Sequence, residues 1–223
     1  MFILLSYPLG VDTPLFGKNP PNGFKKIDSI DKGDQCNSTL MTIFNHTGTH
    51  IDGPYHFDKK GKRIADYDIE DFIFDRPRLI EVPKGEDEAI RFEDMQDNES
   101  AIQSCDLLLV RTGFYQRRGK QSYVDKNPWI DNEAAAFLRE HNNLKAVAID
   151  AISISSYSHL RIGEETHRIL LSRDLYPSEP KLIIEDMKLS GALKTMKRVF
   201  VIPIFVKGVD SAPCTIFAEI EDE

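Results

Sequence analysis

Residues 45–56 read N-H-T-G-T-H-I-D-G-P-Y-H, and this stretch decides how the chain is interpreted. Three of the six histidines of the chain fall here, with one aspartate among them. The four side chains that can bind a metal are His46, His50, Asp52 and His56. Two glycines and a proline lie among them, and these residue types favour a tight turn over a regular helix. The segment therefore reads as a compact loop that carries ligand-type side chains.

Neither an α-helix nor an extended β-strand would bring these four side chains together. On an α-helix, at about 100° per residue, His46 and His50 share a face, but Asp52 and His56 point to another. On an extended strand, at about 3.3 Å per residue, His46 and His50 lie roughly 13 Å apart. That distance is too long for two zinc–nitrogen bonds of about 2.0–2.1 Å each.

The geometry that fits the spacing is a strand that ends near His46, followed by a loop that folds back at Gly48 and Gly53. His50 and Asp52, two positions apart, then chelate locally, and His46 closes the site. A His-His-Asp set with open positions is the kind of ligand set that catalytic metals use. Isolated histidines are usually surface or core residues, but four nitrogen and oxygen ligands within eleven residues favour metal binding over coincidence.

Other motif-based chemistries are not supported. His46 and His50 have the spacing of the H-E-x-x-H zinc motif, but Thr47 stands where the glutamate belongs. One residue too many separates Gly113 from Gly119 for a phosphate-binding loop of the Walker type. Neither a G-x-S-x-G elbow nor a G-x-G-x-x-G fingerprint occurs.

The bulk composition narrows the class of protein. Hydrophobic residues make up 41% and charged residues 29% of the 223 positions, so a sizeable core is feasible. The net charge of −8 argues against nucleic-acid or anionic-membrane partners. The three cysteines are scattered and form no C-x-x-C pair, which indicates neither a disulfide framework nor a cysteine zinc site. The apolar opening of the chain is too short for a membrane span or a signal peptide, so we expect a buried first strand and a cytoplasmic protein.

The pattern along the chain predicts an α/β fold, a single mixed-sheet domain over residues 1–223 with flanking helices. Asp131 is the expected N-cap of one helix, Glu164–Leu171 a second helix and Gly191–Lys197 a short third. Residues 12–33 are rich in Pro, Gly and Lys and predict a long surface loop that borders a binding site. The segments whose β-branched and apolar residues predict strands are Met41–Asn45, Arg78–Val82, Asp106–Arg111, Ala146–Ile154, Lys181–Glu185, Val199–Val206 and Thr215–Ile220.

The pattern H-x-G-T-H-x-D-x-P-x-H over residues 46–56 resembles the signature of the metal-dependent hydrolases called the cyclase family. That family contains bacterial kynurenine formamidases and isatin hydrolases. Other segments are similar to family segments too: L-S-Y-P-L-G, L-L-L-V-R-T-G, A-I-D-A-I-S-I, T-H-R-I-L-L, I-I-E-D-M and V-I-P-I-F-V-K-G-V-D-S-A-P-C. The likeness spans nearly the whole chain, and it implies a β/β/α fold of the swivelling type.

The resemblance also implies a larger ligand set and an activity. The positions that ligate one or two divalent ions, Zn²⁺ or Mn²⁺, in the family correspond to His46, His50, Asp52, His56, His167 and Glu185. The aspartate can bridge a pair of ions. The implied reaction is hydrolysis of a small amide or cyclic substrate, as in the arylformamidase step of tryptophan catabolism to kynurenine. A homodimer or homotetramer is implied as well.

The ligands of this set have different expected roles in hydrolysis. A divalent metal lowers the pKa of a bound water from about 15.7 to near 7, so hydroxide can attack an amide carbonyl at neutral pH. We expect His56 to transfer a proton to the leaving nitrogen, and to serve as a ligand too if a second ion is present. Phe16, in the long first loop, is a candidate aromatic wall for the substrate.

Two alternatives remain open. A lactone hydrolase or a cyclising dehydratase would use the same metal site differently. A di-metal carboxylate protein for redox chemistry or storage is the other, and its support is the Glu-x-x-His pair of Glu164 and His167. Only one copy of that pair occurs and the chain is rich in predicted strands, which disfavours a helical di-metal bundle.

Overall fold

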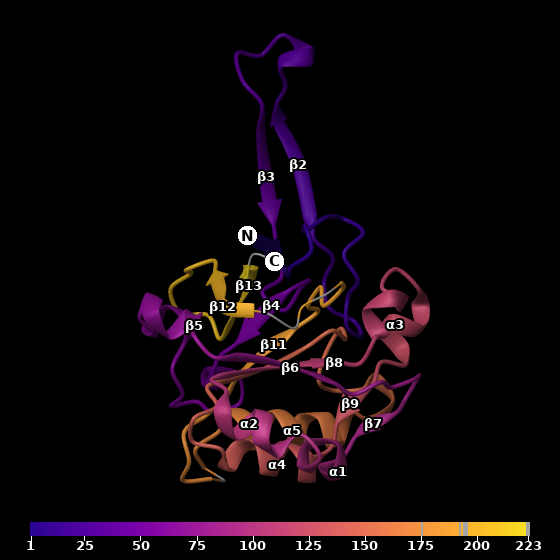
Figure 1. Ribbon diagram of the computed structural model, residues 1–223. Coiled ribbons are helices and arrows are strands. Elements are labelled where there is room, and N and C mark those ends of the chain that lie inside the picture. The colour runs from indigo at the N-terminus through magenta and orange to yellow at the C-terminus, as the bar shows by residue number, and fades with distance from the viewer. Residues whose placement is uncertain (175, 192, 194–195, 222–223) are drawn as a thin grey trace.

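The computed structural model describes residues 1–174, 176–191, 193 and 196–221. Its main feature is a nine-stranded mixed sheet in the order β5-β12-β13-β4-β11-β10-β8-β6, with β1 paired to β13 (Figure 1). These strands are β1 Phe2–Leu4, β4 His50–Asp52, β5 Ile73–Phe74, β6 Pro77–Glu81, β8 Leu107–Arg111, β10 Ala146–Ile149, β11 Leu182–Glu185, β12 Met196–Pro203 and β13 Ser211–Ile220. The expected mixed α/β sheet with flanking helices is confirmed.

One half of the sheet is parallel, and its inner strands are buried on both faces. Strands β6, β8, β10 and β11 run parallel. The sequences of β8, β10 and β11 are almost continuously apolar because neither face meets water, whereas the edge strand β6 exposes Arg78 and Glu81. Leu107 and Leu109 of β8 point into one core, whereas Leu108 and Val110 point into the other. Helices cover this second core: α1 Phe92–Gln96, α2 Glu99–Ser104, α4 Asn132–Glu140 and α5 Leu160–Leu171 (Figure 1).

The other half is antiparallel and closes the first core. Strands β12 and β13 place Val199, Val201, Ile216 and Ala218 against the inner leucines of the parallel half. Their alternate residues face outward, which is the usual pattern for an antiparallel sheet with one solvated face. The resulting layers are helices, parallel sheet and antiparallel sheet.

Strand β4 joins the two halves. It pairs antiparallel with β11 on one side and with β13 on the other. Each half therefore shares its backbone hydrogen bonds with the same three residues, His50, Ile51 and Asp52.

Several local expectations need correction. The first strand exists, but Phe2 is 63% and Leu4 50% exposed. Only the alternate residue Ile3 packs against the core, together with the buried Leu5 that follows the strand. The strand predicted from Ala146 ends at Ile149, since the next residue, Asp150, accepts hydrogen bonds from the backbone of the loop after β8.

Helix boundaries differ as well. The predicted N-cap Asp131 is confirmed, because its carboxylate accepts a hydrogen bond from the amide of Ala134. Helix α5 starts at Leu160, four residues before the predicted start. The prediction of a third helix over Gly191–Lys197 is wrong at its end, because Met196 and Lys197 belong to β12. Residues 192, 194 and 195 of that prediction lie outside the described residues. The remaining short elements are α3 Gln121–Asp125, β7 Ala89–Ile90 and β9 Trp129–Ile130.

The predicted loop over residues 12–33 is only partly a loop. It contains β2, Gly23–Asp28, which pairs antiparallel with β3, Ser38–Thr42. The strand predicted at Met41–Asn45 therefore starts earlier and ends at Thr42, so His46 follows it in a loop. In the described chain no helix is long and apolar enough to cross a membrane.

Candidate metal centre

Strand β4 presents two ligand-type side chains on one face. His50 and Asp52 point the same way because alternate residues of a strand share a face, whereas Ile51 between them enters the core. In the register with β11, His50 lies opposite Glu185. The middle of the sheet therefore brings three potential ligands together.

The turn before β4 folds His46 back over the strand, as the spacing predicted. Gly48 adopts φ +60°, a conformation that favours glycine, and a Cβ there would come within 2.5 Å of a methyl group of Leu9. The ring centroids of His46 and His50 are 5.5 Å apart. Gly53 does not turn in this way, because its backbone is extended and precedes a short 3-10 turn over Pro54–His56.

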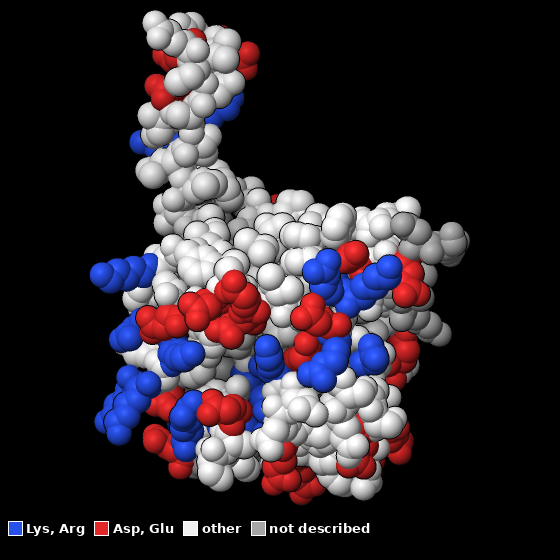
Figure 2. Space-filling view, turned by 60° about the vertical axis from the view of Figure 1, so that its left-hand side comes forward, with Lys and Arg blue, Asp and Glu red and all other residues white. Residues whose placement is uncertain are grey.

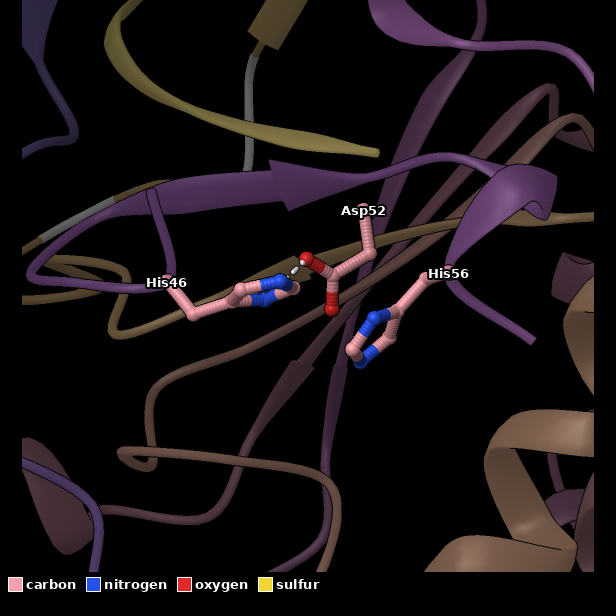
Figure 3. A group of neighbouring side chains, drawn as sticks. All are labelled: His46, Asp52 and His56. Atoms are coloured by element: carbon pink, nitrogen blue, oxygen red, sulfur yellow. Dashed lines mark ion pairs between the residues drawn. The ribbon is translucent and has the colours of Figure 1, made fainter. Parts of the chain in front are cut away.

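Asp52 lies at the centre of the group, between the rings of His46 and His56 (Figure 3). It is fully buried, and its Oδ1 lies 3.0 Å from Nδ1 of His46. Neither carboxylate oxygen of Asp52 makes a hydrogen bond with the described residues, and neither does Nε2 of His50. Buried polar atoms without partners are costly, so these converging atoms fit a bound cation.

The ligand atoms form two overlapping groups that share Asp52. One group is His46, Asp52 and His56, and the other is His50, Asp52 and Glu185. Within each group the atoms lie within 4.8 Å of one another. His167 adjoins the second group, with its Nε2 3.5 Å from Oε1 of Glu185. The structure thus gathers all six sequence-predicted ligands, and the shared carboxylate suits either one ion or a bridged pair.

Hydrogen bonds from the surrounding chain orient the ligands. Nδ1 of His50 donates to the carbonyl of Gly48 at 2.8 Å, which leaves Nε2 as the atom directed at the carboxylates. Nδ1 of His167 donates to the carbonyl of Gly163 at 2.8 Å. Glu185 accepts from the hydroxyl of Ser153 at 2.8 Å. Each imidazole is therefore held with one nitrogen committed and the other facing the site.

Asp210 holds two further imidazoles and had no assigned role in the sequence reasoning. Its Oδ2 accepts from Nε2 of His46 at 2.9 Å and from Nδ1 of His56 at 2.7 Å. Its Oδ1 accepts from the amide nitrogen of Asn45 at 2.8 Å. Nδ1 of His46 and Nε2 of His56 remain for other partners. The segment that resembles the family's final motif contains this aspartate, and that was the only available signal for it.

The charges of the site reinforce one another. Burial raises the pKa of a carboxyl, but His46 and His50 outweigh it and hold the pKa of Asp52 well below its usual range. Burial alone would lower the pKa of His46, yet Asp52 and Asp210 raise it to about 10. Both carboxylates are therefore ionised at neutral pH, and a cation that binds His46 must replace a proton.

A cavity of about 270 Å³ opens onto the ligand group. Its apolar lining includes Phe16, the sequence-predicted substrate contact, together with Phe44 and Phe57. The ring of Phe57 stacks on His167 with centroids 5.3 Å apart. No lysine or arginine occurs among the described residues that line this cavity. Glu164 of the Glu-x-x-His pair lines the cavity but belongs to neither ligand group.

Comparison with known proteins agrees with this geometry. A family model described as "Putative cyclase" matches residues 3–156. The kynurenine formamidase of Bacillus mycoides (strain KBAB4) is 24% identical over 212 residues, covering 95% of this chain and 94% of the relative. Isatin hydrolase A from Ralstonia solanacearum has a similar fold, with a TM-score of 0.82 at 17% identity over 99% of this chain and 92% of that chain.

A second solved structure, described as a "predicted metal-dependent hydrolase from Bacillus stearothermophilus", has a TM-score of 0.76 at 22% identity. It covers 98% of this chain and 97% of that chain. The fold described above is therefore similar to the fold of these two proteins over nearly the whole chain. Since the family model matches more than half of the sequence, the chain belongs to the cyclase family.

Proposed function

We propose that this protein is a metal-dependent hydrolase that cleaves the C–N bond of a small aromatic amide. The observation that carries the proposal is Asp52, a buried carboxylate whose two oxygens have no hydrogen-bond partner and face histidines beside an aromatic-lined cavity. The names of the relatives support the same reaction class, because formamidases and isatin hydrolases both open an amide bond.

The residues that would hold the metal share one property, which is a nitrogen or oxygen atom directed at the position beside Asp52. They are His46, His50, Asp52, His56, His167 and Glu185. A divalent cation such as Zn²⁺ or Mn²⁺ bound there would polarise a carbonyl oxygen and lower the pKa of water. Nitrogen and carboxylate ligands suit both ions.

His56 is the residue that we assign to proton transfer. An expelled amide anion is too basic to leave unaided, so the departing nitrogen must receive a proton. Nδ1 of His56 is hydrogen-bonded to the carboxylate of Asp210, so Nε2 is the atom that can give the proton to the substrate. The side chain is 27% exposed and lines the cavity, which lets it reach a substrate.

The cavity determines which substrates fit. Its volume of about 270 Å³ is near the lower end of the range for small-molecule sites, which suits a compound with one or two rings. Phe16, Phe44 and Phe57 supply aromatic walls, against which a substrate ring can pack edge to face or offset. We therefore favour an N-formyl aromatic amine or a cyclic aromatic amide.

The test is an assay of purified protein with N-formylkynurenine and with isatin, combined with measurement of bound metal. We expect hydrolysis that chelation abolishes and that Zn²⁺ or Mn²⁺ restores. The Asp52→Asn variant should lose both metal and activity, because the shared ligand is replaced. Asp12→Asn, in an exposed loop, is the matched control and should retain both. Full hydrolysis by metal-free protein would overturn the proposal.

A further inference from the structure

Asp186 directly follows the ligand Glu185 and adopts a backbone conformation that residues with a side chain rarely take. Its φ is +51°, in the left-handed region, and Asp87 is the only other non-glycine residue with a positive φ in the described part of the chain. Such a conformation costs free energy and persists only where the surroundings hold it. Strand β11 ends at Glu185, so the contacts of Asp186 hold the end of the strand that enters the metal site.

The backbone of Asp186 joins two other segments of the site. Its amide donates to the carbonyl of Ala151 at 2.8 Å, and its carbonyl accepts from the hydroxyl of Thr49 at 2.6 Å. Thr49 precedes the ligand His50. The loop that starts at Ala151 also donates two hydrogen bonds to the carboxylate of Glu185, at 2.7 and 2.8 Å. A displacement of Asp186 would therefore move Glu185 relative to His50, which lies opposite it in the sheet.

Arg118 and Tyr123 hold the side chain of Asp186. The guanidinium of Arg118 donates to both carboxylate oxygens, with Nε 2.9 Å from Oδ1 and Nη2 2.8 Å from Oδ2. The hydroxyl of Tyr123 donates to Oδ1 at 2.5 Å. The guanidinium also lies over the ring of Tyr7, 3.9 Å from its centroid. A bidentate pair with a cation–π contact fixes both the position and the plane of the carboxylate.

This ion pair differs from the pairs at the surface. Figure 2 shows basic and acidic side chains next to one another on one face of the body, where water screens their attraction. The side chain of Asp186 is 2% and that of Arg118 18% exposed, so water screens this pair much less.

The segment that carries Arg118 and Tyr123 contributes no ligand of its own. Arg118 lies between the 3-10 turn Phe114–Arg117 and α3, and Tyr123 lies on α3, in the segment that follows β8 (Figure 1). Neither side chain lines the cavity or belongs to a ligand group, and the same holds for Asp186. Any effect of these residues on the site must therefore pass through the backbone next to Glu185.

We propose that Arg118 and Tyr123 are positioning residues of the metal site, which hold the carboxylate of Asp186 so that Glu185 stays opposite His50. The inference rests on the proposed metal-dependent function, whose ligands include Glu185. It makes the affinity for the cation depend on a segment that never touches the cation.

Charge and position have opposite effects on cation affinity, and this makes the inference testable. Loss of Arg118 removes a positive charge and leaves Asp186 without its partner cation, and both changes favour a bound cation electrostatically. Loss of Arg118 also releases the carboxylate of Asp186, and a displaced Glu185 binds the cation less well. We therefore expect Arg118→Met to lower the affinity for Zn²⁺ by at least about 10-fold, as removal of residues that orient ligands does.

Competition with a chelator measures the Zn²⁺ affinity of the full chain, and urea unfolding of the metal-free protein measures its stability. Arg111→Met is the matched control, because Arg111 is 16% exposed, pairs with Glu81 and belongs to neither ligand group. Both variants should lose stability, but only Arg118→Met should lose affinity. Arg118→Lys keeps the charge without the bidentate geometry and should restore only part of the affinity. Tyr123→Phe removes one hydrogen bond and no charge, so it should lower the affinity in the same direction even if Arg118→Met does not fold.

Co²⁺ gives a second readout, which a loss of stability alone does not change. The visible absorption of bound Co²⁺ depends on its ligands, so Arg118→Met should shift the spectrum toward that of Glu185→Gln, whereas Arg111→Met should keep the wild-type spectrum. Unchanged or increased Zn²⁺ affinity in Arg118→Met and Tyr123→Phe would overturn the inference and leave the proposed function standing. A wild type that binds neither Zn²⁺ nor Co²⁺ would overturn the proposed function as well.

Discussion

Asp52 and Asp210 are both ionised carboxylates of the site, but their surroundings differ. Asp52 is fully buried and its oxygens accept no hydrogen bond from the described residues. The side chain of Asp210 is a quarter exposed and is hydrogen-bonded to two imidazoles. A buried carboxylate without a hydrogen-bond partner indicates a metal ligand, whereas hydrogen bonds to two histidine rings indicate a residue that orients ligands.

Replacement of Asp210 by Asn should weaken metal binding by about 10–100-fold, the usual effect of removing a residue that orients a ligating histidine. The amide of Asn is neutral, so its oxygen accepts more weakly from His46 and His56 than the carboxylate does, and its nitrogen cannot accept the bond that Asn45 donates to Oδ1 of Asp210. Titration against a competing chelator would measure the affinity, with Asp12→Asn as the control. Unchanged affinity in the Asp210 variant would show that other contacts orient the two rings.

The different distances along the sequence explain which site residues could be predicted. His46, His50, Asp52 and His56 lie within eleven positions, so their types and spacing alone indicated a metal site. His167 and Glu185 were indicated only by resemblance to a family. Asp210 lies 154 positions from His56, and only the pairing of β13 with β4 brings the segment that precedes β13 to the site. Local patterns contain no information about such a contact.

At the scale of elements, strands buried on both faces were the easiest to predict. Strands β8 and β11 carry runs of buried apolar residues, and the predictions match them within a residue. The prediction also matches the partly exposed edge strand β6 within a residue. Strand β4 was missed because it has three residues, two of them polar ligands. Strand β2 was missed because it packs on no core and so shows no alternation of apolar and polar residues.

Helix α5 depends on Gly163 for its distance from the loop of residues 153–156. A Cβ at this position would overlap the side chain of Ser155 and come within 3.0 Å of its Cα. We expect Gly163→Ala to destabilise the protein by about 1–3 kcal/mol, as overpacking of a tight contact does. It should also lower metal affinity, because the displaced helix carries His167.

Urea unfolding and the chelator titration would measure the two effects of Gly163→Ala. Arg168→Ala, on the exposed side of the same helix, should change neither by a comparable amount. A Gly163→Ala variant with wild-type stability would mean that the 153–156 loop moves freely away from α5.

Lys181 precedes β11 and links its start to the helical layer. Its backbone amide donates to the carbonyl of Leu170, and its Nζ donates to the carbonyl of His141, both at 2.8 Å. Burial lowers the pKa of Lys181 to about 8 from its usual 10.5. Between these two pH values the unfolded chain binds more protons than the folded chain, so the contribution of Lys181 to stability rises with pH from about 8 to 10.5 and is constant below about 8.

The corresponding measurement compares urea unfolding of the wild type and Lys181→Met at pH 7.5 and pH 10.5. The wild type should gain up to about 3 kcal/mol relative to the variant over this range, from about 1.4 kcal/mol per pKa unit. Other titrating groups are common to both proteins and cancel in the comparison. Parallel pH profiles would contradict the depressed pKa.

At the scale of the whole molecule, the metal site couples ligand binding to stability. A cation that binds only the folded chain stabilises it by about 2.7 kcal/mol at 100 times its Kd. For a chain of this size we expect Zn²⁺ or Mn²⁺ at that excess to raise the Tm by about 5–10 °C. Differential scanning calorimetry would measure the shift, which should disappear in Asp52→Asn.

The position of β4 between the two halves of the sheet has a consequence for slow opening motions. Neither the parallel nor the antiparallel half can separate from the other without breaking the backbone bonds of the strand that carries His50 and Asp52. Amide hydrogen exchange in β11 and β13 should therefore accelerate together when the cation is chelated, while exchange in the separate hairpin of β2 and β3 stays the same. Release of the ion and separation of the two halves of the sheet would then be a single cooperative event, and its rate would be the rate at which the three-residue strand β4 loses its backbone hydrogen bonds.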